Sequence, residues 1–154
     1  MKKIVLLFSL LLLVIATLPV YAQKYKTAAD TGKLNLEYVK VSNDIAELTA
    51  ELASAQNKLP DYQAKAKSAE SDAQDAASSS SDQASKATNG SVSDAKKANK
   101  RAKKAYNEAK GARSANNDVS DQNDKIAKLS SKLKKKQNRL HELDEMRAAI
   151  NAKL

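Results

Sequence analysis

The sequence of 154 residues has no cysteine and no tryptophan, and it contains only one phenylalanine, one histidine, two prolines and three glycines. Without cysteine, disulfide bonds and thiolate-bound metals are excluded. A globular core of ordinary depth also needs large side chains, which are scarce beyond residue 22. A long coiled coil does not need them, because a narrow seam along its length holds the helices together.

The motifs of catalytic and cofactor sites are also missing. His141 is the only histidine, and its acidic neighbours could not form a metal site with that side chain alone. Beyond residue 22 the glycines are isolated, so no phosphate-binding loop occurs, and neither does a nucleophile or zinc-protease motif. We therefore predict that the protein is not an enzyme and binds no cofactor or metal.

Residues 1–22 have the pattern of a secretory signal peptide. Lys2 and Lys3 precede a nearly continuous apolar run, Pro19 ends it, and Val20-Tyr21-Ala22 fits a cleavage site. The run is shorter than the roughly 20 residues needed to span a bilayer. We predict cleavage and export across the cytoplasmic membrane, most simply into a bacterial periplasm. The alternatives are a eukaryotic secretory route and an uncleaved N-terminal membrane anchor.

A heptad pattern of apolar residues begins at Leu34 and continues to Ala87. Alternating steps of four and three residues over many heptads are typical of a left-handed coiled coil. Large side chains occupy the first half of the pattern, and alanine replaces them in the second. The two rows are Leu34, Val41, Leu48, Ala55, Tyr62, Ala69, Ala76 and Gln83, and Tyr38, Ile45, Leu52, Leu59, Ala66, Ala73, Ser80 and Ala87.

Residues 88–93 form the only turn-like cluster within this long helical pattern. Gly90 could adopt the positive φ that a sharp reversal needs. Reversal after Gly90 pairs six apolar positions whose residue numbers add to 181. They are Val41 with Leu140, Leu48 with Leu133, Ala55 with Ile126, Tyr62 with Val119, Ala69 with Ala112, and Ala76 with Ala105.

This coincidence predicts an all-α fold, a long antiparallel coiled-coil hairpin over residues 33–154. Its helices are expected at 33–88 and 94–154, with a turn at 89–93, after a short polar lead-in at 23–32. Asp30 or Thr31 could cap the first helix, and Ser91 or Ser93 the second. The hairpin could be single, or self-associate into a four-helix bundle.

The seam residues of the returning helix change with distance from the turn. Those near the turn are alanines, which predicts an Ala-rich tip, and those near the chain ends are larger, which predicts a Leu-rich base. Large buried side chains at the base would supply most of the stability, about 1.5–3 kcal/mol each. The expected returning seam is Ala98, Ala102, Ala105, Ala109, Ala112, Val119, Ile126, Leu129, Leu133, Leu140, Leu143 and Ile150.

Each predicted helix contains a segment of low helix propensity, and the two segments are expected to face each other across the hairpin. Pro60 lies beside the seam, which predicts a kink in a continuous helix; the alternative is a break that gives three helical segments. Opposite it, residues 114–124 are poor helix formers. The seam is expected to shift register there, with either Gln122 or Asn123 in the core slot. Local fraying is the simpler expectation, and a hinge is the alternative.

Positive charge is concentrated in the second half of the chain. Residues 94–154 hold 17 bases and 8 acids, whereas residues 33–88 hold 6 bases and 9 acids. The acids cannot neutralise this excess, which is either a solvated face or a binding surface for an anionic partner. The candidate binding residues are Lys96, Lys97, Lys100, Arg101, Lys103, Lys104, Lys110 and Arg113.

An exported protein would meet lipopolysaccharide, phospholipid headgroups or wall polymers, and nucleic acid is an improbable partner. In size, charge and helical arms the chain resembles the Skp-type periplasmic chaperones. It shares no motif with them and lacks alternating β-forming residues that could build their trimeric body. We therefore expect a structural or interaction scaffold of the cell envelope, bound to itself or to an envelope protein. The alternative is a holdase or an anionic-surface-binding module.

Overall fold

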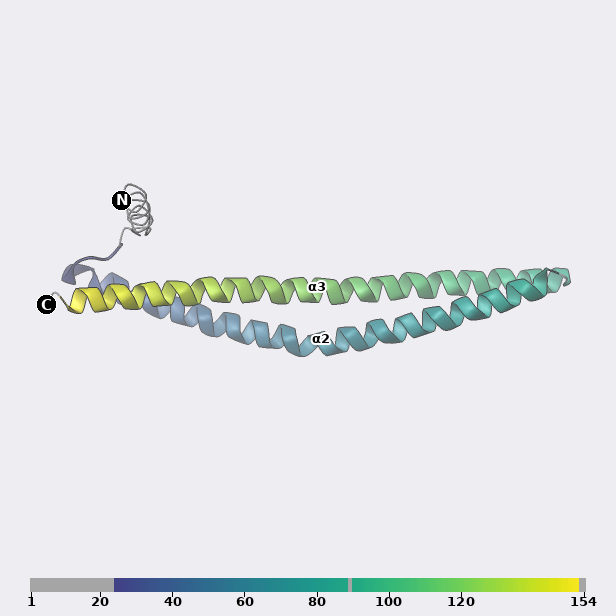
Figure 1. Ribbon diagram of the computed structural model, residues 1–154, viewed down its shortest axis with the longest axis horizontal. Coiled ribbons are helices and arrows are strands. Elements are labelled where there is room, and N and C mark those ends of the chain that lie inside the picture. The colour runs from purple at the N-terminus through teal and green to yellow at the C-terminus, as the bar shows by residue number, and fades with distance from the viewer. Residues whose placement is uncertain (1–23, 89, 153–154) are drawn as a thin grey trace, which may run out of the picture. The chain divides into compact units, whose positions relative to one another are not determined.

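The computed structural model describes residues 24–88 and 90–152, so the predicted signal peptide lies outside the described residues. A short 3-10 helix, η2 (Ala28–Asp30), leads into two long helices, α2 (Thr31–Ala87) and α3 (Val92–Asn151). The two long helices pack against each other, so the predicted all-α helical hairpin is confirmed (Figure 1). Each begins two residues earlier than expected. None of the described helices combines the length and apolar character of a membrane span.

The hairpin divides into two compact units. The first unit comprises residues 24–40 and 140–152 of the described chain, and the second comprises Val41–Arg139. Each unit therefore contains a segment of α2 and a segment of α3. The second unit also contains the turn between the helices.

The seam on α2 follows the predicted heptads. All sixteen predicted positions are buried or half-buried. In the second unit, Lys136 Nζ lies 2.6 Å from Asp44 Oδ2, and these residue numbers add to 180, one less than the predicted 181. In the first unit, Arg147 donates to Asn35 Oδ1 at 3.3 Å, and the sum is 182. The antiparallel register predicted from the sequence therefore holds within each unit.

The seam on α3 corrects the sequence prediction. Ala102 and Ala109 are exposed, whereas Glu108 is half-buried and Gln122 is buried, with 8% of its surface accessible. Gln122 therefore takes the core slot without any shift of register. The predicted shift was wrong because the second seam row lies three residues after the first along the whole helix. That row begins with Arg101, which is exposed but donates to the hydroxyl of Ser79 on α2. Its other members are all buried or half-buried: Glu108, Ala115, Gln122, Leu129, Lys136, Leu143 and Ile150.

Pro60 lies inside α2, which continues through it, so the predicted continuous helix is confirmed and the alternative of a break is wrong. Figure 1 shows α2 changing direction midway along its length, the region that contains Pro60. Because proline has no N–H group, the carbonyl of Gln56 loses its usual helical donor. One residue earlier, the carbonyl of Ala55 accepts a hydrogen bond from Gln122 Nε2 at 2.5 Å. The buried glutamine thus connects α3 to the backbone of α2 beside the proline.

The turn is held by a capping box at the start of α3. The Ser91 N–H group and hydroxyl donate to Asp94 Oδ2 at 3.1 and 3.0 Å. Ser91 is therefore the capping residue, one of the two predicted. Hydrogen bonds from the backbone and side chain of Ser91, together with Lys97, lower the pKa of Asp94 below its ordinary value. The carboxylate also lies in the first turn, where the helix dipole favours negative charge.

Gly90 is needed because the last turn of α2 and the side chain of Asp94 lie too close to it for a Cβ atom, and not because of a positive φ. No described glycine has a positive φ, which corrects the sequence expectation. A Cβ atom at residue 90 would instead lie 2.8 Å from the backbone oxygen of Lys86 and 2.9 Å from Asp94 Oδ2. The backbone oxygen belongs to the last turn of α2 and cannot move away without distorting that turn.

Gly90→Ala should therefore lower the free energy of unfolding by about 1–3 kcal/mol, the usual cost of overpacking. Gly111→Ala is the matched control, because nothing lies within 4 Å of a Cβ atom there. In the interior of α3 it should raise stability by about 0.5–1 kcal/mol. Urea denaturation followed by circular dichroism measures both changes. Equal effects of the two substitutions would contradict a steric role for Gly90.

The first unit has a compact apolar core that includes part of the lead-in. Leu34 and Leu143 have no accessible surface, and Met146 and Ile150 are also buried. Tyr25, which was expected to lie in a polar lead-in, is buried as well. Its hydroxyl donates to Glu37 Oε2 at 2.5 Å. The lead-in thus folds onto α2 and contributes to this core.

A second capping box fixes the lead-in. The Thr27 N–H group and hydroxyl donate to Asp30 Oδ2 at 3.2 and 2.8 Å. These bonds and one from the Lys26 N–H group lower the pKa of Asp30. Thr27 is thus the capping residue of η2, and α2 continues from it at Thr31. The expectation that Asp30 or Thr31 itself caps the first helix is corrected.

Candidate functional site

All eight candidate binding residues lie on the part of α3 that belongs to the second unit. Because an α-helix turns by about 100° per residue, they fall on two faces. The α2-facing group consists of Lys97, Lys100, Arg101 and Lys104, which line one hollow together with Gln83 of α2. The outer group lies on the opposite side of α3 and consists of Lys96, Lys103, Lys110 and Arg113. The structure therefore does not bring all eight together.

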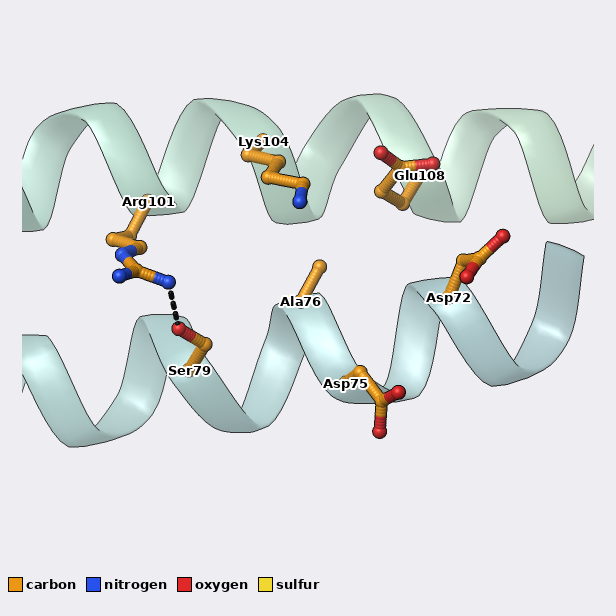
Figure 2. Close-up of a pocket in the computed structure, with 7 residues that line it drawn as sticks. All are labelled: Asp72, Asp75, Ala76, Ser79, Arg101, Lys104 and Glu108. Carbon is orange, nitrogen blue, oxygen red and sulfur yellow. Dashed lines mark hydrogen bonds between the residues drawn. The ribbon is translucent and has the colours of Figure 1, made fainter.

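Arg101 and Lys104 of this group also line an open groove between the helices, shown in Figure 2. This groove has a volume of about 460 Å³, and buried Ala76 lies between its two walls. Arg101 points towards α2 and donates to the hydroxyl of Ser79. Lys104 also points towards α2. The lining residues are Asp72, Asp75, Ala76 and Ser79 of α2 and Arg101, Lys104 and Glu108 of α3.

Charges of both signs meet in this groove. Three carboxylates, those of Asp72, Asp75 and Glu108, share it with two bases. Lys97 forms an ion pair with Asp94 on its own helix, with Nζ 3.4 Å from Oδ1. An external anion would have to compete with these acids, and exposed ion pairs contribute only about 0–1 kcal/mol each. The α2-facing group is thus suited to fixing how the helices pair.

The acids do not form a metal site in the part of the chain that the structure describes. Within it, no group of three or more histidine, cysteine, aspartate or glutamate side chains is placed to hold a metal ion. Asp75 points away from α3 in Figure 2, so it does not converge with Glu108.

The outer group has a different environment. Lys96, Lys103, Lys110 and Arg113 are exposed, and none of them makes a hydrogen bond or ion pair with another described residue. Tyr106 lies among them, with 71% of its surface exposed. A shallow hollow of about 390 Å³ is lined by Tyr106, Ala109, Lys110, Arg113, Ser114 and Asn117, all from α3. We call Lys96, Lys103, Tyr106, Lys110 and Arg113, together with Ala102 and Ala109, the outer basic face.

The second run of bases, residues 125–139, has acidic neighbours on α2. Asp44, Glu47 and Glu51 line one groove together with three of these bases, Lys132, Lys135 and Lys136. Lys136 forms its ion pair with Asp44 across the seam. Glu47 shares this groove with Lys132 and Lys135. Part of the positive charge of residues 125–139 therefore has acidic neighbours on α2.

Sequence reasoning did not assign a role to Tyr106 or Glu108. Tyr106 could have been noticed as the only aromatic residue within the first basic run. Nothing in the sequence indicated a seam position at Glu108. Near the turn, the row of Ala102 and Ala109 fits the heptad pattern as well as the row of Arg101, Glu108 and Ala115 does. Comparison with known protein families, characterised proteins and solved structures finds no match for the chain.

Proposed function

We propose that this protein is an exported, non-enzymatic helical hairpin that serves as an interaction scaffold of the cell envelope. The observation that supports this proposal is the narrow seam. Two helices of 57 and 60 residues are joined by two rows of side chains each, and most other side chains are exposed. Such an arrangement presents a large surface per residue to partners. The signal-peptide pattern of residues 1–22 supports export.

A second candidate function is binding to an anionic envelope surface, such as lipopolysaccharide, phospholipid or a wall polymer. The outer basic face favours it, because its four bases have no acidic partner among the described residues. Binding through exposed charges is screened over about 8–10 Å near physiological ionic strength. It should therefore weaken steeply as salt is added.

Export and partner binding can be tested together on protein recovered from cells. Cleavage after Ala22 would give a mature chain that begins at Gln23, which intact mass measurement detects; retention of residues 1–22 would contradict export by cleavage. A wash of intact envelopes at about 500 mM salt, followed by cross-linking, then separates the two functions. A scaffold should keep a defined protein partner, whereas anionic-surface binding should be lost. Cross-linking to no envelope component even without the wash would contradict both.

A further inference from the structure

We infer that the outer basic face of α3 is a docking surface for anionic phospholipid headgroups, with the ring of Tyr106 lying at headgroup level. This inference rests on the proposed binding to anionic surfaces and specifies both the face and the partner. The proposed scaffold function does not depend on it.

The residues of this face form three neighbouring rows along α3. Lys96, Lys103 and Lys110 are spaced seven residues apart, which places successive ammonium groups about 10 Å apart along the helix axis. Tyr106 and Arg113 form the second row, also seven residues apart, and Ala102 and Ala109 form the third. The three rows together span about 100° of the helix surface. A flat surface can therefore contact all of them at the same time.

The chemistry of the face is that of a helix lying on a lipid surface. Tyrosine has an apolar ring with a polar tip, and it is enriched where a membrane meets water. Lysine and arginine can lay their apolar stems along such a surface while their charges stay with the headgroups. Ala102 and Ala109 are exposed and small, so they allow the helix backbone to approach closely. Charge and an exposed aromatic ring thus occur on the same face.

The distribution of acids selects this face over the rest of the hairpin. The groove on the α2 side of α3 contains Asp72, Asp75 and Glu108, which an anionic membrane would repel. A membrane is planar, so it reaches one side of the hairpin at a time. A flexible anionic polymer could instead reach both groups of bases. A planar anionic surface is therefore expected to discriminate between two groups of lysines that lie within the same fifteen residues of the chain.

Two triple variants test the choice of face. Lys96→Gln, Lys103→Gln and Lys110→Gln remove three charges from the outer basic face. The matched control, Lys97→Gln, Lys100→Gln and Lys104→Gln, removes three charges from the α2-facing group of the same segment. Each base near an anionic surface contributes about fivefold in affinity, so the outer triple should weaken binding to vesicles of 30% phosphatidylglycerol in phosphatidylcholine by about a hundredfold. The control should weaken it by about fivefold or less, with equal helicity by circular dichroism.

Tyr106→Trp gives an independent readout, because the chain has no other tryptophan. Its emission should shift to the blue on addition of the same vesicles and stay unchanged with pure phosphatidylcholine. Equal losses in the two triple variants, or an unshifted tryptophan on bound protein, would overturn the inference while leaving anionic-surface binding intact. Binding to soluble polyphosphate but not to the vesicles would do the same. No binding to either anion would overturn both.

Discussion

Leu143→Ala is expected to lower the free energy of unfolding by about 2–5 kcal/mol, the usual cost of removing a buried leucine and leaving a cavity. Leu143 and Leu34 have no accessible surface, and they are the largest fully buried side chains of the described residues. Both belong to the first unit, where Met146 and Ile150 are also buried. Since the seam is narrow, few neighbouring groups can move in to fill the space.

Leu36→Ala is the matched control. Leu36 lies two residues from Leu34 on α2, but 74% of its surface is exposed, so its truncation should change stability by no more than about 0.5 kcal/mol. Chemical denaturation of the two variants, followed by circular dichroism, makes the comparison. If Leu143→Ala proved as mild as Leu36→Ala, the core of the first unit would be far looser than its burial indicates.

The sequence predicted the α2 seam because large residues mark it. Leu34, Val41 and Ile45 fix the phase of the heptad, and each later position then follows by counting. The sequence did not predict how deeply each position would be buried. Leu48 belongs to the seam but is half-buried, whereas Leu143 is fully buried. Depth depends on the residues that surround a position from both helices, which heptad counting does not include.

The phase of α3 near the tip could not be predicted, because alanine is found both in seams and on exposed faces. Ala102 and Ala109 fit a heptad as well as Arg101 and Glu108 do. Gln122 and Leu129 decide which of these two rows belongs to the seam, because both are buried and lie on the row that includes Arg101 and Glu108. A helix without an interruption carries that phase over its full length.

The same ambiguity limited prediction of the candidate site. Charge counting located the basic segment, since it needs only the sequence. It could not divide the eight residues into two faces, because that division depends on which alanines face α2. Tyr25 shows a related limit. Its burial depends on the lead-in folding onto α2, and local sequence carries no sign of that contact.

Hydrogen exchange should divide the second unit into a weakly and a strongly protected part. Around the turn, the seam positions are alanines such as Ala73, Ala76 and Ala105, with Arg101 and Glu108 in the remaining row. Farther from the turn, the seam of the same unit contains larger residues: Val41, Ile45, Leu48, Leu52, Leu59, Val119, Ile126, Leu129 and Leu133. Each large side chain that becomes buried contributes about 1.5–3 kcal/mol, and an alanine contributes far less.

Local opening near the turn should therefore cost at least about 4 kcal/mol less than opening around Leu129, a difference of about a thousandfold in exchange rate. Amide exchange measured by NMR, corrected for intrinsic rates, should be fastest for residues 78–97 and slowest near Ile126, Leu129 and Leu133. Protection that is uniform across the second unit would contradict this division. Helix cooperativity, rather than the area buried by each heptad, would then set the stability, since all backbone hydrogen bonds of the unit would open together.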